Sequence, residues 1–212
     1  MKSVFCILLS SMAAWAQAIP IANLETQKLN AAVAAYQDKQ ATRLIDRDGG
    51  GGLALLKGSS FHNGTIEVEL AGKPSAGSFA AARGFVGIAF RVQSGGSKYE
   101  CIYLRPTNGR ADDMLRRNHS TQYTAEPEWG WERLRKESPG VYESYVDLEA
   151  GAWTRYKIVV KGARAELYVH DAAQPYLIVK DLKLGDAAGA VALWVGPGTE
   201  AWFTNLKVTP AP

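Results

Sequence analysis

The side chains with the widest chemical repertoire gather in one segment, from Tyr99 to Asp147. This segment has little apolar periodicity, and stretches with strand-like alternation flank it on both sides. Its aromatic content argues against disorder, and long ordered loops are usually functional. The residues that we predict to bind a substrate are Arg105, His119, Gln122, Tyr123, Trp129, Trp131, Arg133 and Tyr145.

These residue types suit a saccharide. Flat aromatic rings pack against the apolar face of a pyranose ring, and planar polar side chains exchange hydrogen bonds with its hydroxyls. A structural interpretation stays open for Trp129 and Trp131, which could equally pack the loop onto its scaffold. For Arg116, Arg117 and Arg135, pairing with acids at the surface is the favoured interpretation.

Catalysis in this segment would depend on His119, which lies in a polar stretch and could act as a general base near neutral pH. Glu132 or Glu143 would then be its acidic partner. Glu143, Tyr145 and Asp147 would share one face of a strand. That polar row could line a groove, or it could keep an edge strand soluble.

The first residues predict a secretory signal peptide over 1–18. Lys2 supplies a positive charge, Val4 to Ala14 form an apolar stretch, and Ala16-Gln17-Ala18 is a small-residue cleavage signal. No later stretch approaches the roughly 20 apolar residues of a spanning helix. We therefore expect a secreted or periplasmic protein with no membrane span, whose residues 19–212 form a single domain.

Charge and cysteine content exclude further classes. The formal net charge is +3, and the basic residues are interleaved with acids along the chain. This is unlike the clustered basic surface of a nucleic-acid binder. After cleavage Cys101 is the only cysteine, which excludes an internal disulfide. Because Cys101 lies in an alternating apolar run, we predict a small buried side chain there and not a nucleophile.

Runs with period-two alternation recur with turn signals between them, the pattern of an all-β sandwich or barrel. Phe85–Gln93 is the most apolar run and predicts a central strand, joined to Tyr99–Arg105 by a tight turn. A second predicted hairpin joins Trp153–Lys161 to Ala165–His170. The other predicted strands are Thr65–Leu70, Tyr176–Lys180, Ala190–Val195 and Ala201–Val208.

Two segments are less regular. Leu24–Gln40 is rich in alanine and helical by propensity alone, but Asp38-Lys39 could equally be the turn of an early hairpin. We favour strands, because the rest of the chain is β and an amino-terminal strand is needed to pair with the last one. The stretch from about 106 to 140 is predicted to be a long insert between strands.

Five stretches follow one another in a recognisable order: FHNGTIEVEL, GFVGIAFRVQ, KYECIYLRP, GAWTRYKIVVKGARAELYVHD and AVALWVGPGTEAWFTNLKV. In this order they resemble the concanavalin A-like lectin/glucanase superfamily, in particular its laminin-G-like modules and the 3-keto-disaccharide hydrolases. The resemblance covers Phe61 to Val208. It implies a jelly-roll sandwich of two curved antiparallel sheets, whose concave face often binds carbohydrate. Function does not follow from this fold.

The catalytic and metal motifs of that superfamily are absent. Its glucanases carry Glu-x-Asp-x-x-Glu or Glu-x-Asp-x-Glu on one strand, whereas Glu67 and Glu69 are the one acidic pair on a clear strand here. We interpret this pair as a solvated face. The clusters Asp46-Arg47-Asp48 and Asp112-Asp113 are predicted turns, and neither supplies the six to eight oxygens that Ca²⁺ takes. We predict no metal and no cofactor, and a structural calcium ion that bridges distant loops stays an open alternative without support from these motifs.

Three functions therefore compete. The leading hypothesis is a carbohydrate-binding protein, the second is a glycoside hydrolase related to the 3-keto-disaccharide hydrolases, and the third is a non-catalytic protein-interaction module. Exposed Trp129 and Trp131 beside a shallow groove would favour the first. A close pair of carboxyls, or a histidine against a carboxylate in a pocket, would favour the second. Buried tryptophans and paired charges would favour the third.

Overall fold

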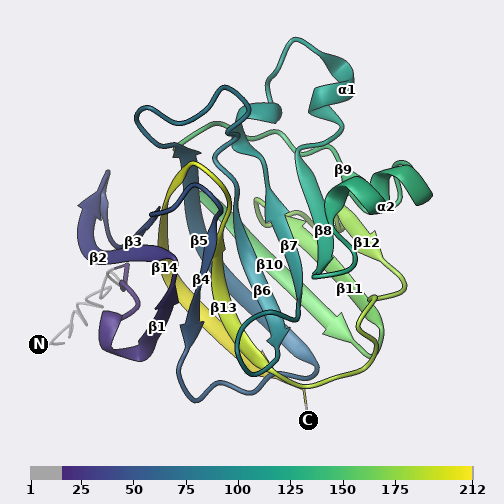
Figure 1. Ribbon diagram of the computed structural model, residues 1–212, viewed down its shortest axis with the longest axis horizontal. Coiled ribbons are helices and arrows are strands. Elements are labelled where there is room, and N and C mark those ends of the chain that lie inside the picture. Colours follow the sequence, from purple (N-terminus) through teal and green to yellow (C-terminus); the bar gives the residue numbers. More distant parts are fainter. Residues whose placement is uncertain (1–15, 212) are drawn as a thin grey trace, which may run out of the picture.

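The computed structural model describes residues 16–211, which form a sandwich of two antiparallel sheets with seven strands each (Figure 1). The front sheet, in spatial order, consists of β1 (Leu24–Gln27), β4 (Gly52–Leu56), β13 (Ala190–Val195), β6 (Val86–Val92), β7 (Tyr99–Leu104), β8 (Thr121–Glu126) and β9 (Glu143–Ser144). The back sheet consists of β12 (Leu177–Val179), β11 (Arg164–Val169), β10 (Thr154–Lys161), β5 (Gly64–Pro74), β14 (Thr199–Pro210), β3 (Lys39–Asp46) and β2 (Leu29–Tyr36). The all-β jelly-roll prediction is confirmed.

Helical structure within these residues is short. The helices are α1 (Met114–Arg117) and α2 (Trp131–Glu137), and the 3-10 turns are η1 (Ile21–Asn23) and η2 (Pro106–Asn108). Asp113 begins α1, because its carboxylate accepts hydrogen bonds from the amides of Leu115 and Arg116. None of these helices has the length and apolar character that crossing a bilayer requires.

The main core lies between the sheets and follows from strand alternation. On β6 the side chains of Val86, Ile88 and Phe90 point inward, and on β5 those of Ile66, Val68 and Leu70 do the same. Each fully buried side chain of this size stabilises the fold by about 1.5–3 kcal/mol. As predicted, β6 is the central strand of its sheet, and every residue in it is buried.

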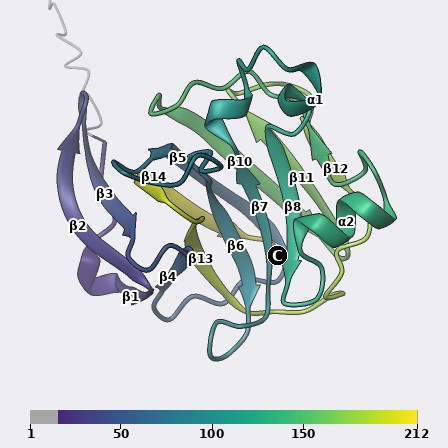
Figure 2. The same cartoon turned by 45° about the horizontal axis from the view of Figure 1, so that its top comes forward.

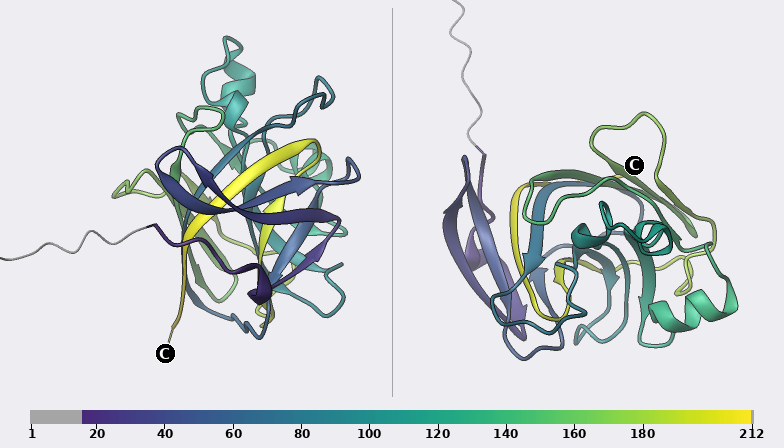
Figure 3. Two further views of the ribbon diagram at one scale, coloured as in Figure 1. Left: turned by 90° about the vertical axis from the view of Figure 1, so that its left-hand side faces the viewer. Right: turned by 90° about the horizontal axis from the view of Figure 1, so that it is seen from above.

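The ambiguous segment near the amino terminus is a hairpin, as favoured from sequence. β2 and β3 pair in register from Leu29 with Asp46 to Tyr36 with Lys39, and β3 pairs with β14. Sheet pairing therefore overrides the helical propensity of the alanines. This hairpin lies at one side of the sandwich and α2 at the opposite side (Figures 2 and 3).

The prediction of one long loop insert at about 106–140 is wrong. β8 lies inside that stretch and pairs along its whole length with β7, from Tyr99 with Glu126 to Leu104 with Thr121. The irregular parts are therefore two shorter excursions, one carrying α1 and one carrying α2. The strand could not be recognised from the sequence TQYTAE because its composition is polar. Its outward side chains face a groove and not bulk solvent.

Most of the predicted signal peptide lies outside the described residues. Residues 16–18 are described, and Gln17 pairs with Asn205 through two hydrogen bonds. The backbone amide of Gln17 donates to Asn205 Oδ1 at 2.8 Å, and the backbone amide of Asn205 donates to the Gln17 carbonyl at 3.0 Å. Ala18 forms a β-bridge with Thr204. Cleavage after Ala18, secretion and the domain boundaries stay predictions.

Candidate functional site

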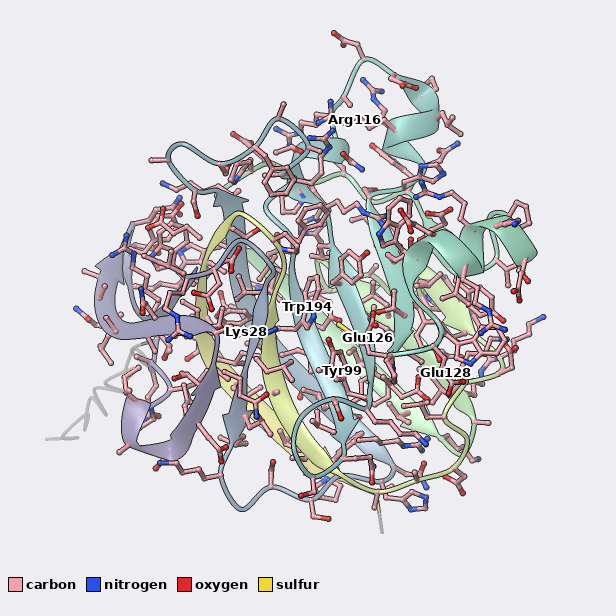
Figure 4. The ribbon with its side chains drawn as sticks, in the orientation of Figure 1. Lys28, Tyr99, Arg116, Glu126, Glu128 and Trp194 are labelled. Carbon is pink, nitrogen blue, oxygen red and sulfur yellow. The ribbon has the colours of Figure 1, made fainter. Side chains whose placement is uncertain are left out.

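A groove of about 830 Å³ runs across the outer face of the front sheet. Its floor comes from β4, β13, β7 and β8, and its walls come from the turn after β1, the loop before β6 and the excursions that carry α1 and α2. Trp194, Tyr99 and Glu126 lie near the middle of this face, with Arg116 towards α1 (Figure 4). No strand of the back sheet lines it.

An aromatic stack forms the floor. Tyr103 on β7 and Trp194 on β13 both pair with Gly87 of the strand between them. Because Gly87 has no side chain, the two rings meet above it, with centroids 4.5 Å apart and an interplanar angle of 27°. Phe85 packs edge-on against Tyr103 at 6.2 Å. Tyr103 itself is buried, whereas Tyr99 and Trp194 are half-buried and present apolar ring surface to the groove, of the kind that packs against a sugar ring.

Glu126 is the acidic group of this floor. It lies opposite Tyr99 in the β7–β8 pairing and is half-buried. Among residues 16–211 no side chain or backbone group hydrogen-bonds to its carboxylate or pairs with it. Burial raises the pKa of this carboxyl above its ordinary value. Glu126 is therefore an available acceptor, and in its protonated form an available donor, towards a ligand.

A basic cluster forms the end of the groove near α1. Buried Glu143 receives two hydrogen bonds from Arg135, at 2.9 and 2.7 Å, and lies 3.7 Å from Arg105. His119 Nε2 is 3.4 Å from the same carboxylate. Burial lowers the pKa of His119, and the charges of Arg135 and Arg105 lower it further, while Glu143 opposes the shift. At neutral pH the His119 imidazole is therefore uncharged and adds no positive charge to the cluster.

Three of the predicted binding residues line the groove: Arg105, His119 and Trp131. Trp131 is 41% exposed, and the guanidinium of Arg135 lies 4.8 Å from its ring centroid. Arg105 is almost fully buried and donates to the Tyr103 hydroxyl at 3.0 Å and to the side-chain oxygen Oε1 of Gln122 at 3.1 Å. These contacts fix the edge of the aromatic floor.

The other predicted residues lie elsewhere. Gln122 is fully buried beneath Arg105, so its predicted direct contact with a substrate is wrong. Trp129 is half-buried under the guanidinium of Arg133, 3.7 Å from the ring centroid, and neither residue lines the groove. The remaining residues outside the groove lining are exposed Tyr145, exposed Glu132, buried Glu143 and buried Tyr123.

Tyr123 was predicted to bind a substrate, and this is wrong because its side chain points into the core. Its hydroxyl donates to buried Glu100 and accepts from the amide of Lys183 at 2.7 Å. Glu100 also accepts from the amide of Leu184 at 2.9 Å. Successive strand residues face opposite sides, so Gln122 faces the outer side and Tyr123 the core. The pair ties β7 and β8 to the segment before β13.

Glu100→Gln is expected to change the pH dependence of stability. Burial raises the pKa of Glu100 above its ordinary 4.5, so the folded protein holds this proton more tightly than the unfolded chain. The contribution of Glu100 to stability therefore falls as pH rises above about 4.5. Glutamine does not titrate and lacks this loss. In urea unfolding, the free energy of unfolding of Glu100→Gln should therefore rise relative to that of the wild type between about pH 4 and about pH 8. Parallel curves for the two proteins would contradict the assignment.

Sequence reasoning missed Tyr99, Tyr103, Glu126 and Trp194 as site residues. Each reads as an ordinary strand residue, and only the pairing of β13, β6, β7 and β8 brings them onto one face. The available signal was alternation. In AVALWV, Trp194 stands between buried Leu193 and Val195 and must face the other side.

The structure agrees with two predictions from the sequence, that the Glu67 and Glu69 pair is a surface feature and that Cys101 is a buried side chain and not a nucleophile. Glu67 and Glu69 lie on the outer face of the back sheet, and Glu69 pairs there with Lys39. Cys101 is fully buried, and burial raises the pKa of its thiol. Within residues 16–211, His, Cys, Asp and Glu side chains do not gather in groups of three that could hold a metal ion.

No protein-family model and no curated protein sequence matches this chain. Solved structures do. The carbohydrate-binding module CBM66 from Bacillus subtilis aligns over 87% of this chain and 93% of its own, with 14% identity and a TM-score of 0.61. The exoplasmic/lumenal domain of VIP36, in a Ca²⁺/Man3GlcNAc-bound form, aligns over 93% and 89%, with 11% identity and a TM-score of 0.54.

A protein of galectin-like fold from Bacillus subtilis aligns over 89% of both chains, with 10% identity and a TM-score of 0.56. At such identities the likeness shows the fold and not the activity. Structures similar to this chain thus include a carbohydrate-binding module and a domain in a Man3GlcNAc-bound form. Together with the two seven-stranded sheets, these matches identify the fold as the concanavalin A-like lectin/glucanase jelly roll, as the strand order predicted.

Proposed function

We propose that this protein is secreted or periplasmic and binds an oligosaccharide in the groove of the front sheet. The observation that carries this proposal is the aromatic floor of Tyr103 and Trp194 next to the carboxylate of Glu126, which has no partner among residues 16–211. A sugar ring needs an apolar platform for its C–H face and polar groups at its rim for its hydroxyls. Carbohydrate-binding proteins among the similar folds support the same function.

The rings would contribute affinity and the polar groups orientation. Tyr103 and Trp194 are held against each other and against Phe85, so binding would cost little side-chain entropy. Trp131 stands at the rim, 5.8 Å from the Arg105 guanidinium, and would cover the other face of a bound ring. Glu126, Thr124 and His119 line the same groove and would hydrogen-bond to hydroxyls.

The test is glycan binding by three tryptophan variants. On a glycan array, followed by calorimetry on the best ligand, Trp194→Ala and Trp131→Ala are expected to weaken binding about tenfold or more. Trp129→Ala is the matched control, because Trp129 lies under Arg133 and Lys183 and does not line the groove. It is expected to bind as wild type does. Equal losses of affinity in all three variants would contradict the proposal. Failure of the wild type to bind any glycan would also contradict it and would favour a protein-interaction module.

A glycoside hydrolase is the second candidate, on the observation of a histidine in contact with a carboxylate beside the groove. His119 and Glu143 are 3.4 Å apart, and Glu126 carries a carboxyl whose raised pKa suits a general acid. Retaining and inverting hydrolases need two free carboxyls, however, and Glu143 is held by Arg135. Product analysis with wild type, Glu126→Gln and His119→Ala distinguishes the two functions, since a pure binding protein releases no product.

A further inference from the structure

One end of the groove carries positive charge that the carboxylates of the described residues leave unbalanced. Arg83 donates from Nη1 to the carbonyls of Ala80 and Ala82, at 2.7 and 3.0 Å. Arg116 donates from Nε to Asn108 Oδ1 at 2.9 Å and from Nη2 to the carbonyl and hydroxyl of Thr107, both at 3.1 Å. All these acceptors are neutral. Within residues 16–211 neither arginine has a carboxylate at ion-pair distance.

The neighbouring charges do not compensate. Arg105 and Arg135 line the same end and share one carboxylate, that of Glu143. The other carboxylate of this end, Asp113, is engaged by the amides that begin α1. Four guanidinium groups thus face two carboxylates. Burial lowers the pKa of Arg83, and the like charges of Arg116 and Arg105 lower it further, as repulsion within an unbalanced cluster requires.

Arg83 and Arg116 are positioned in advance. The amide of Thr107 donates to the carbonyl of Arg83 at 3.3 Å, and the carbonyl of Thr107 accepts from Arg116, so one residue anchors both. Each arginine still has N–H groups without a protein acceptor among the described residues, at Nε and Nη2 of Arg83 and at Nη1 of Arg116. A planar guanidinium with free N–H groups matches the oxygens of a carboxylate or a sulfate.

The charge of the groove also differs between its two ends. Arg116 lies towards α1, whereas Glu126 lies beside Tyr99, further along the same floor (Figure 4). The aromatic floor separates the two, with Arg105 only 5.1 Å from the ring centroid of Tyr103. A ligand with an acidic group at the arginine end and neutral hydroxyls at the Glu126 end would satisfy both charges at once.

We propose that the saccharide bound here is acidic, with a carboxylate or sulfate group that binds between Arg83 and Arg116. This proposal rests on the proposed function and adds the chemical class of the ligand. A neutral saccharide would leave both arginines without a counter-charge inside the groove. Because the attraction is electrostatic, binding should weaken as salt concentration rises.

The first experiment is an array of acidic glycans, each beside its neutral counterpart, with carboxyl-reduced partners for uronic acids and desulfated partners for sulfated sugars. Preferential binding of the acidic members is expected, and the two sets of pairs distinguish a carboxylate from a sulfate. Equal binding of acidic and neutral members would overturn this inference and leave the proposed function standing. Binding of no glycan would overturn both.

The second experiment uses variants on the best acidic ligand. Arg83→Gln and Arg116→Gln are each expected to weaken binding of the acidic member about tenfold or more, since each removes a hydrogen bond to a charged group. Binding of the neutral member should not change. Arg83→Lys keeps the charge and should recover part of the loss. Arg164→Gln on the back sheet, where Arg164 pairs with Glu166, is the matched control. Equal losses for acidic and neutral members in folded Arg83→Gln would contradict the assignment.

Discussion

Arg91→Met is expected to lower the free energy of unfolding by about 3–5 kcal/mol, the usual cost of removing one partner from a buried charged network. The side chain of Arg91 is fully buried. It donates to the carbonyls of His62, Gly185 and Gly162, at 2.7–3.0 Å. Methionine fills the space of the stem but leaves these carbonyls without a donor.

Local backbone geometry explains why an arginine points there. The β6–β13 register shifts between Ala190 and Ala192, so the ladder has a bulge next to Arg91. Arg91 has a φ of +54°, in the left-handed region. Its side chain therefore turns towards the loops at that end of the sandwich, where the Asn63 side chain and Asp186 also accept from it, both at 3.2 Å.

Chemical denaturation of Arg91→Met, with Arg164→Met as the control, measures this effect. Arg164 is partly exposed and pairs with Glu166 on the surface, so its removal should leave the unfolding midpoint almost unchanged. If Arg91→Met unfolded within about 1 kcal/mol of the wild type, the network would not hold the loops together. Asp186→Asn tests the electrostatic part, because 54% of the Asp186 side chain is exposed and it should matter much less than the carbonyls.

The sequence could predict the strands because their residues obey local rules. Alternation and turns located the β6–β7 and β10–β11 hairpins, and both are present. β8 was not predicted because the alternation rule depends on a contrast between apolar and polar residues. TQYTAE lacks a clear contrast of this kind, since it carries polar or small side chains on its outer face. The same error placed Tyr123 with the ligand-binding residues, whereas its position in β8 directs it to the core.

The candidate site was half predictable for a related reason. Arg105, His119 and Trp131 belong to one segment, and their types alone attracted attention. Trp194 follows Trp131 at a large distance along the chain and reaches the same groove only through the order of strands in the front sheet. Spacing in one sequence carries no such long-range information, so half of the aromatic floor depended on topology.

Gly87→Ala is expected to damage both the fold and the groove. A Cβ built on Gly87 would lie 2.3 Å from the carbonyl oxygen of Ile102 and 2.6 Å from both Cα and Cβ of Tyr103. These are backbone atoms and a fixed Cβ of the neighbouring strand, so no side-chain rotation relieves the overlap. Overpacking of this kind costs about 1–3 kcal/mol. We expect a loss near 3 kcal/mol, because β6 is the central strand and cannot move away.

The same substitution tests whether the stack above Gly87 serves ligand binding. Separation of Tyr103 from Trp194 should weaken glycan binding about tenfold or more, even where the variant is fully folded at low temperature, and should alter the tryptophan fluorescence. Gly50→Ala is the control, since Gly50 also lines the groove but a Cβ there meets nothing within 4 Å. A folded Gly87→Ala protein with unchanged affinity would mean that the ligand does not use this floor. A loss in Gly87→Ala alone would show that one missing side chain on β6 lets strands β7 and β13 build a single binding surface.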